Sequence, residues 1–152
     1  MPAVFVRVDD RLIHGQVTQG WLPGMKIDEV AAVPERADKL AKDLMGLALP
    51  PEYGLRVLSP AEAAEYAKTS PKRVFFIFES LALLDAALKK GLTLPSVNIG
   101  GLHFREGREK VLKDVYLTPK EKVFVKDLTT RGVKVDGRSV PSDPHAGLEG
   151  IL

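Results

Sequence analysis

One chain of 152 residues with a net charge of +2 has the size of a single domain. It contains no cysteine, which excludes disulfides, cysteine-ligated metal centres and thiol catalysis. Charged residues make up 28% and hydrophobic residues 45%, the balance of a globular protein, and so small a charge excess argues against nucleic acid as a partner.

Strand-like and helix-like patterns alternate along the chain. Short β-branched or apolar runs typical of strands lie at residues 4–8, 29–33, 55–58, 73–78, 96–99, 115–117 and 133–135. Apolar residues at helical spacing lie between them, at residues 13–22, 34–48, 60–68, 81–90 and 119–131. The alternation predicts one α/β domain, residues 1–152, with a mostly parallel six- to seven-stranded sheet and helices on both faces.

Several helix ends carry start and stop signals. Ser59 and Thr118 each begin a capping box with proline at the first helical position. Ser80 is expected to cap the helix that follows it. The first helix is expected to stop at Pro23-Gly24, and the second to open at Pro34-Glu35.

Several other classes of protein are disfavoured by missing patterns. The N-terminus has no basic stretch and meets acidic residues early, so we expect no signal peptide. No apolar run reaches the ~20 residues of a membrane span, and the expected location is the cytoplasm. Dinucleotide-binding, Walker A and nucleophile-elbow patterns are missing, and the three histidines have no close spacing. We therefore expect neither a metal nor a cofactor.

The loop after the first predicted strand holds the densest group of reactive side chains. In parallel sheets the site lies at the carboxyl ends of the strands, which here selects residues 9–14, 33–36, 79–80 and 100–107. Asp9, Asp10, Arg11 and His14 lie within six residues of one another in the first of these loops. His14 is the one side chain there that is nucleophilic when neutral near pH 7, and Arg11 offers a planar fork suited to phosphoryl oxygens. Each could also be a capping or surface residue, and only their combination at this place favours function.

At these residues the chain resembles a known family. The sequence VDDRLIHGQV at residues 8–17, followed by Trp21, is similar to the signature of mannose/fructose/sorbose-type IIB subunits of the bacterial phosphoenolpyruvate-dependent sugar phosphotransferase system. The sequence SVNIGG at residues 96–101 and FREG at residues 104–107 resemble that family's second block, and the similarity extends over nearly the whole chain.

The resemblance implies that His14 is phosphorylated and that Arg11 assists phosphoryl transfer. Transfer between two imidazoles needs positioning and charge stabilisation, which Arg11 and the loop amides could supply without a metal. Asp10 either orients the imidazole or only structures the loop. Further candidates around the phosphoryl group are Leu12, Ile13, Ser80, Gly100 and Gly101, with Arg105 at the rim of the pocket.

Simpler roles stay open for several of these candidates. Helix capping alone would explain Ser80, and a tight turn would explain Gly100 and Gly101. His103 is expected at the surface rather than as a second phosphoryl carrier. Of the two apolar residues before His14, we expect Leu12 to be exposed for docking and Ile13 to be buried.

The resemblance also implies partners. A IIA phosphocarrier would donate the phosphoryl group, and a sugar held by IIC and IID membrane subunits would accept it, so contact with the membrane is expected only through partners. The sequence leaves the sugar and a possible homo-oligomer open. The family commonly has an Asn-Asp pair after its second strand, where this chain has VPER at residues 33–36. A regulatory module of the same fold, whose His14 phosphorylation is sensed by a partner, is the alternative.

Overall fold

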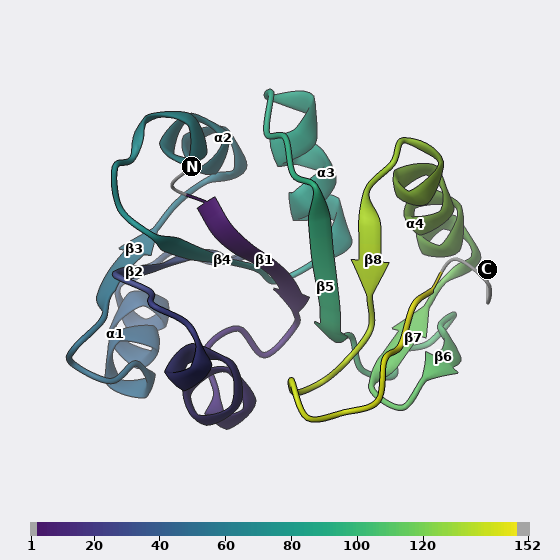
Figure 1. Ribbon diagram of the computed structural model, residues 1–152, viewed down its shortest axis with the longest axis horizontal. Helices are drawn as coiled ribbons and strands as arrows, with labels where there is room; N and C mark the ends of the chain where they lie inside the picture. The colour runs from purple at the N-terminus through teal and green to yellow at the C-terminus, as the bar shows by residue number, and fades with distance from the viewer. Residues whose placement is uncertain (1–2, 149–152) are drawn as a thin grey trace.

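Six parallel strands form the central sheet of the computed structural model, which describes residues 3–148 (Figure 1). In sheet order they are β3 (Gly54–Val57), β2 (Glu29–Val33), β4 (Val74–Phe78), β1 (Ala3–Asp9), β5 (Ser96–Gly101) and β8 (Lys134–Asp136). All five residues of β2 and of β4 are buried, as expected for strands covered on both faces. Residues 1–2 and 149–152 of the predicted domain lie outside the described residues. Residues 1–2 also belong to the N-terminal segment for which we expect no signal peptide.

Helices cover both faces of the sheet, which confirms the predicted fold class. On one face lie α2 (Pro60–Thr69), α3 (Leu81–Lys89) and α4 (Pro119–Thr130), which pack into the larger apolar cluster. On the other lie α1 (Lys39–Ala48), the six-residue π-helix η1 (Gln16–Trp21) and the 3₁₀ turn η2 (Leu22–Gly24). The predicted capping boxes at Ser59 and Thr118 are both formed, and Ser80 caps α3.

Two element predictions are wrong in detail. Residues 115–117 form a strand, β7, but it pairs antiparallel with the unpredicted β6 (Glu109–Leu112) in a separate small sheet. The helical run predicted at residues 13–22 is found as η1 and the η2 turn that follows it, which ends at Gly24, so the predicted stop at Pro23-Gly24 is confirmed. The second helix does not open at Pro34, because the side chain of Asp38 accepts a hydrogen bond from the Ala41 amide and caps α1 there.

The carboxyl end of β1 lies where the chain connections diverge. From β1 the chain passes to η1 on one face, whereas from the neighbouring β4 it passes to α3 on the opposite face. Such a divergence opens a crevice above the strand ends in open α/β sheets. The loop that carries His14 therefore leaves the sheet at this crevice.

Candidate functional site

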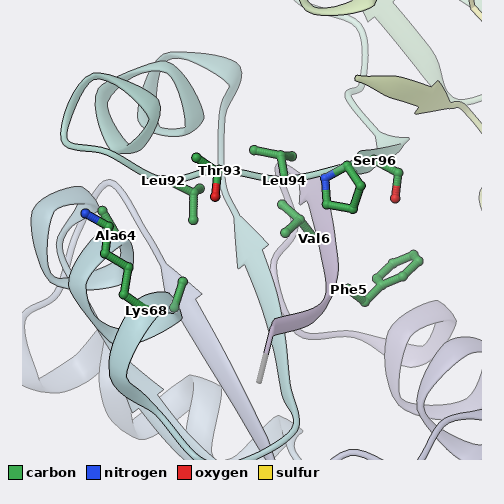
Figure 2. Close-up of a pocket in the computed structure, with 10 residues that line it drawn as sticks. Phe5, Val6, Ala64, Lys68, Leu92, Thr93, Leu94 and Ser96 are labelled. Atoms are coloured by element: carbon green, nitrogen blue, oxygen red, sulfur yellow. The ribbon is translucent and has the colours of Figure 1, made fainter. Parts of the chain in front are cut away.

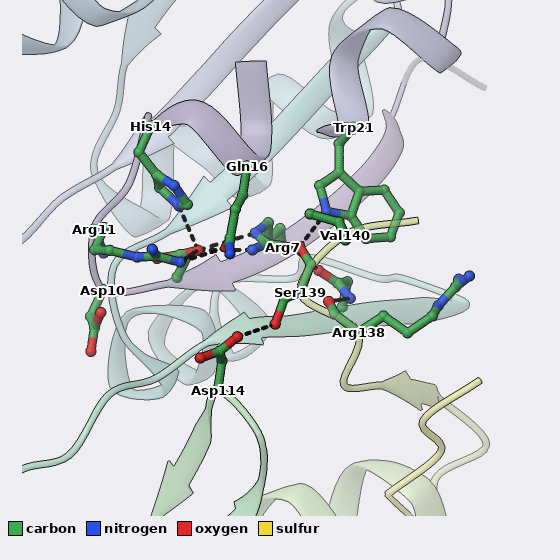
Figure 3. Close-up of polar contacts among 12 residues, drawn as sticks. Arg7, Asp10, Arg11, His14, Gln16, Trp21, Asp114, Arg138, Ser139 and Val140 are labelled. Carbon is green, nitrogen blue, oxygen red and sulfur yellow. Dashed lines mark hydrogen bonds and ion pairs between the residues drawn. The ribbon is translucent and has the colours of Figure 1, made fainter. Parts of the chain in front are cut away.

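Asp9, the last residue of β1, contacts Arg7, Arg11 and His14, three of the residues labelled in Figure 3. Its fully buried carboxylate lies 2.7 Å from Nε2 of His14 through Oδ2. The same oxygen accepts from Nη2 of Arg7 at 2.9 Å and from Nη2 of Arg11 at 3.3 Å. One carboxylate thus joins a buried arginine, an exposed arginine and the imidazole.

A local reversal of the chain brings these groups together. The Leu12 amide donates to the Asp9 carbonyl, and Leu12 adopts a positive φ of 59°, which is rare for a residue with a branched side chain. This turn lets the Arg11 amide donate to Oδ1 of Asp9 at 2.9 Å. The His14 carbonyl then accepts from the amides of Val17 and Thr18, which starts the helical segment.

The electrostatics of the site keep Asp9 ionised. Burial alone would raise the pKa of Asp9, but the hydrogen bond from His14 and the charge of Arg7 outweigh it and hold the pKa well below its usual range. Burial lowers the pKa of Arg7, and Asp9 counteracts this effect through its charge and hydrogen bonds. An ionised carboxylate only accepts hydrogen bonds, so Nε2 of His14 is the donor in this contact. In a neutral ring with the proton on Nε2, the lone pair lies on Nδ1.

Asp10 does not orient the His14 ring, contrary to the first of its two predicted roles. Its side chain points away from the His14 cluster in Figure 3. Oδ1 lies 2.7 Å from Nδ1 of His103, and Oδ2 accepts from the His103 amide at 2.9 Å. Arg108, which bonds Glu121 and the His103 carbonyl, lies 3.7 Å from the same carboxylate. Asp10 therefore anchors the loop after β5, the second of its predicted roles, and His103 is half-exposed.

Gly100 and Gly101 make room for side chains of β1. Both lie within β5, so neither forms the tight turn considered from sequence. A Cβ on Gly100 would overlap the guanidinium of Arg7, and one on Gly101 would lie 2.5 Å from Oδ2 of Asp9. The two glycines are thus required by the Arg7–Asp9 pair, whatever their relation to a phosphoryl group.

Two other candidates lie at neighbouring strand ends. The Ser80 hydroxyl accepts from the Leu83 amide and donates to Glu35 at 2.9 Å. Its contact to Glu35 ties the divergent loop at residues 33–36 to the start of α3. Arg105 is exposed in the loop after β5.

Of the apolar pair before His14, Ile13 is buried as predicted, whereas Leu12, predicted to be exposed, is partly buried. Ile13 is 7% exposed and packs with Val17 and Trp21 in the cluster under η1. Leu12 is only partly buried and lines a groove of about 220 Å³ together with residues of α1 and of the loop at residues 33–36.

Four residues of the site were not singled out by sequence. Arg7 and Asn98 are buried in the sheet, the Ser139 carbonyl accepts from Arg7, and Gln16 accepts from Arg11 at 2.7 Å. A signal existed for Arg7, because it stands two residues before Asp9 in an apolar strand, where alternate residues share a face. An arginine there must find an anion on the same face.

A pocket lies at the opposite end of the strands from His14 (Figure 2). It has a volume of about 340 Å³, and its lining comes from the amino ends of β1 and β5, from α2 and from the segment before β5. Lys68 is its one charged lining residue. Its lining shares no residue with the cluster around His14, and we assign it no part in the site.

Two further structural findings concern membranes and metals. Between residues 3 and 148, no helix is both long and apolar enough to cross a bilayer. In the same part of the chain, no group of three or more His, Asp or Glu side chains is arranged to hold a metal ion.

Known proteins share both the sequence and the architecture. The family described as "PTS system sorbose subfamily IIB component" matches residues 3–152. The sorbose-specific EIIB component of Lacticaseibacillus casei is 33% identical over 97% of this chain and 93% of its own length. The mannose-specific EIIAB component of Escherichia coli K12 is 31% identical over 96% of this chain, which spans 47% of that longer protein. The crystal structure of the IIBSor domain of the Klebsiella pneumoniae sorbose permease has a TM-score of 0.89 at 30% identity, covering 99% of this chain and 95% of that one. The chain therefore belongs to the sorbose-subfamily IIB components of the sugar phosphotransferase system, within the mannose/fructose/sorbose type.

Proposed function

We propose that Nδ1 of His14 accepts a phosphoryl group from a phosphohistidine of a IIA protein and passes it to a sugar held by IIC and IID membrane partners. The observation that carries this proposal is the 2.7 Å contact between Nε2 of His14 and the ionised Asp9 carboxylate. It ties up one ring nitrogen and leaves the lone pair of the other available for attack.

The chemical step balances without a cofactor. The Nδ1 lone pair attacks the donor's phosphorus, and a new N–P bond forms as the donor's N–P bond breaks. The donor's ring carries a proton on its other nitrogen, so the electron pair of the broken bond neutralises that ring and it leaves as a neutral imidazole. The His14 ring gains positive charge as its bond forms, and the Asp9 carboxylate stabilises that charge through the Nε2 proton. The phosphoryl group carries its own negative charge across unchanged.

Arg11 is suited to hold the transferring group. Its side chain is 39% exposed, and its Nε and Nη2 atoms contact Asp9. Within the described residues its Nη1 has no hydrogen-bond partner, so two N–H donors remain for phosphoryl oxygens.

A donor protein has to approach closely. The His14 side chain is only 17% exposed, and reacting atoms must come within about 3–3.5 Å of each other. A partner that reaches Nδ1 therefore also covers the surface around the loop, including Leu12 and the groove beside α1. The fused EIIAB relative supports a IIA protein as this partner, and we place the exchange in the cytoplasm, where phosphoenolpyruvate is formed.

Stepwise transfer tests this function. The chain is incubated with phosphoenolpyruvate, the general phosphotransferase proteins and a IIA donor, with membranes that carry IIC and IID added in a second step. We expect acid-labile, base-stable label on the chain, none on a folded His14→Gln variant, and loss of label to sugar in the second step. Label that enters the chain but never reaches any sugar would favour the regulatory alternative, and no label at all would refute the proposal.

A further inference from the structure

Two arginines contact the same carboxylate from opposite sides. Arg7 is fully buried and directs Nε and Nη2 at Oδ2 of Asp9, at 3.3 and 2.9 Å. The side chain of Arg11 is 39% exposed, and its contacts to the Asp9 carboxylate are longer, at 3.3 Å. Because Arg11 can turn toward a phosphoryl group, Arg7 is the permanent counter-ion of Asp9.

The surroundings of Arg7 keep it in this position. Its Nη1 donates to Oδ1 of Asn98 at 2.7 Å and to the Ser139 carbonyl at 3.0 Å. The same Ser139 carbonyl also accepts a hydrogen bond from Nε1 of Trp21 in η1. This second bond fixes the position of the carbonyl that Arg7 contacts. The missing side chain of Gly100 provides the space that the guanidinium occupies. Burying the guanidinium of Arg7 costs free energy unless each of its N–H donors has a partner. Packing alone therefore does not explain an arginine at this position.

The protonation state of Asp9 decides which nitrogen of His14 can react. An ionised Asp9 accepts the Nε2 proton and leaves Nδ1 with its lone pair. A protonated Asp9 would instead donate to Nε2, and the ring proton would then reside on Nδ1, where it blocks attack. A buried carboxyl group without a counter-charge favours the protonated form.

We infer that Arg7 is a positioning residue that acts through Asp9: it keeps Asp9 ionised and thereby fixes His14 in the tautomer with a free Nδ1. Arg7 itself does not touch the phosphoryl group. The expected effect of Arg7 on phosphoryl acceptance rests on the proposed function. Its effect on the tautomer of His14 can be measured without any phosphoryl transfer.

NMR of the ¹⁵N-labelled protein tests the assignment. Long-range ¹H–¹⁵N correlations of the His14 ring distinguish its two tautomers. We expect the Nε2–H form in the wild type and a shift toward the Nδ1–H form in Arg7→Met. A wrong tautomer can cost up to ~10⁴ in rate, and we expect phosphoryl acceptance per folded molecule to fall at least ~10²-fold. Arg7→Lys keeps the charge but not the planar guanidinium, so we expect a tautomer population and an acceptance rate between those of Arg7→Met and the wild type.

Three comparisons separate positioning from a merely structural role. Arg11→Met should slow acceptance but leave the tautomer as in the wild type. Gly100→Ala should displace Arg7 without removing it and shift the tautomer, so the test survives if Arg7→Met fails to fold. An Nδ1–H tautomer in the wild type, or an unchanged tautomer in folded Arg7→Met or Gly100→Ala, would overturn the assignment. A wild type with the Nε2–H tautomer that accepts no phosphoryl group would instead count against the proposed function alone.

Discussion

At the scale of single residues, Asp9 and Asp10 show how two adjacent carboxylates acquire different tasks. Asp9 ends β1 and meets His14 and Arg7, whereas Asp10, the first residue of the turn after the strand, meets His103. The sequence places both acids beside His14 but does not show the direction of either side chain. This is why the orienting role was attributed to the wrong one of the two.

Arg11→Lys tests the phosphoryl contact at this scale. The lysine keeps the positive charge but loses the planar fork that can present two N–H groups to one phosphoryl group. Loss of one charge-stabilising contact typically costs ~10²–10³ in rate, and we expect a decrease of this order in acceptance from a IIA donor. Rapid-quench measurement with saturating phosphorylated donor gives the rate. A near-native rate would show that Arg11 is only a surface charge or a structural contact.

At the scale of elements, α1 leaves an apolar face uncovered beside the site. Leu40, Leu44 and Leu47 are 62%, 57% and 84% exposed, although their spacing predicts a helix face turned to the core. Only Met45 of α1 is buried. Leu40 and Leu44 line the same groove as Leu12, so the uncovered face is continuous with the loop that carries His14.

Polar substitution of this face should weaken the encounter with the donor. We expect Leu40→Gln and Leu44→Gln to raise the KM for phosphorylated IIA about tenfold, which corresponds to about 1.4 kcal/mol of docking energy. Because both side chains are already exposed, the Tm should change by no more than a few degrees. Val123→Gln on α4, at a position that is 69% exposed, is the matched control and should leave the KM unchanged. Equal effects of all three substitutions would place the docking face elsewhere.

The same elements show how far sequence predicts this fold. Caps and buried strands are specified locally, so Ser59, Ser80 and the run at residues 74–78 were predicted correctly. Local patterns do not show which strands pair, and residues 115–117 were therefore assigned to the main sheet instead of a separate hairpin. They also cannot show that the apolar face of α1 is exposed, or that a side chain from another strand occupies the space beside Gly100.

At the scale of the whole molecule, two buried carboxylates link stability to pH. Burial would raise the pKa of Glu29, but hydrogen bonds from the Tyr66 hydroxyl and from Arg56 outweigh it and lower this pKa. The pKa of Asp9 is lowered as well. Between about pH 5 and pH 3 the unfolded chain therefore binds more protons than the folded one, and stability falls as the pH falls.

Urea unfolding at a series of pH values tests this linkage. We expect the free energy of unfolding to be nearly constant from pH 7 to about pH 5 and to fall by about 1–3 kcal/mol toward pH 3. Glu29→Gln removes one of the two groups, so it should be less stable at pH 7 and show a shallower decrease. A stability that stays level or rises toward pH 3 would contradict the linkage, and a Glu29→Gln slope equal to the wild-type slope would exclude Glu29 from it.

Identification of the phosphorylated atom tests the proposed mechanism most directly. After transfer from phosphorylated IIA to the ¹⁵N-labelled chain, ³¹P–¹⁵N coupling shows which nitrogen carries the phosphorus. We expect phosphorus on Nδ1 of His14, with the Nε2 proton still directed at Asp9. Phosphorus on Nε2 of His14, on His103 or on Ser80 would contradict the mechanism.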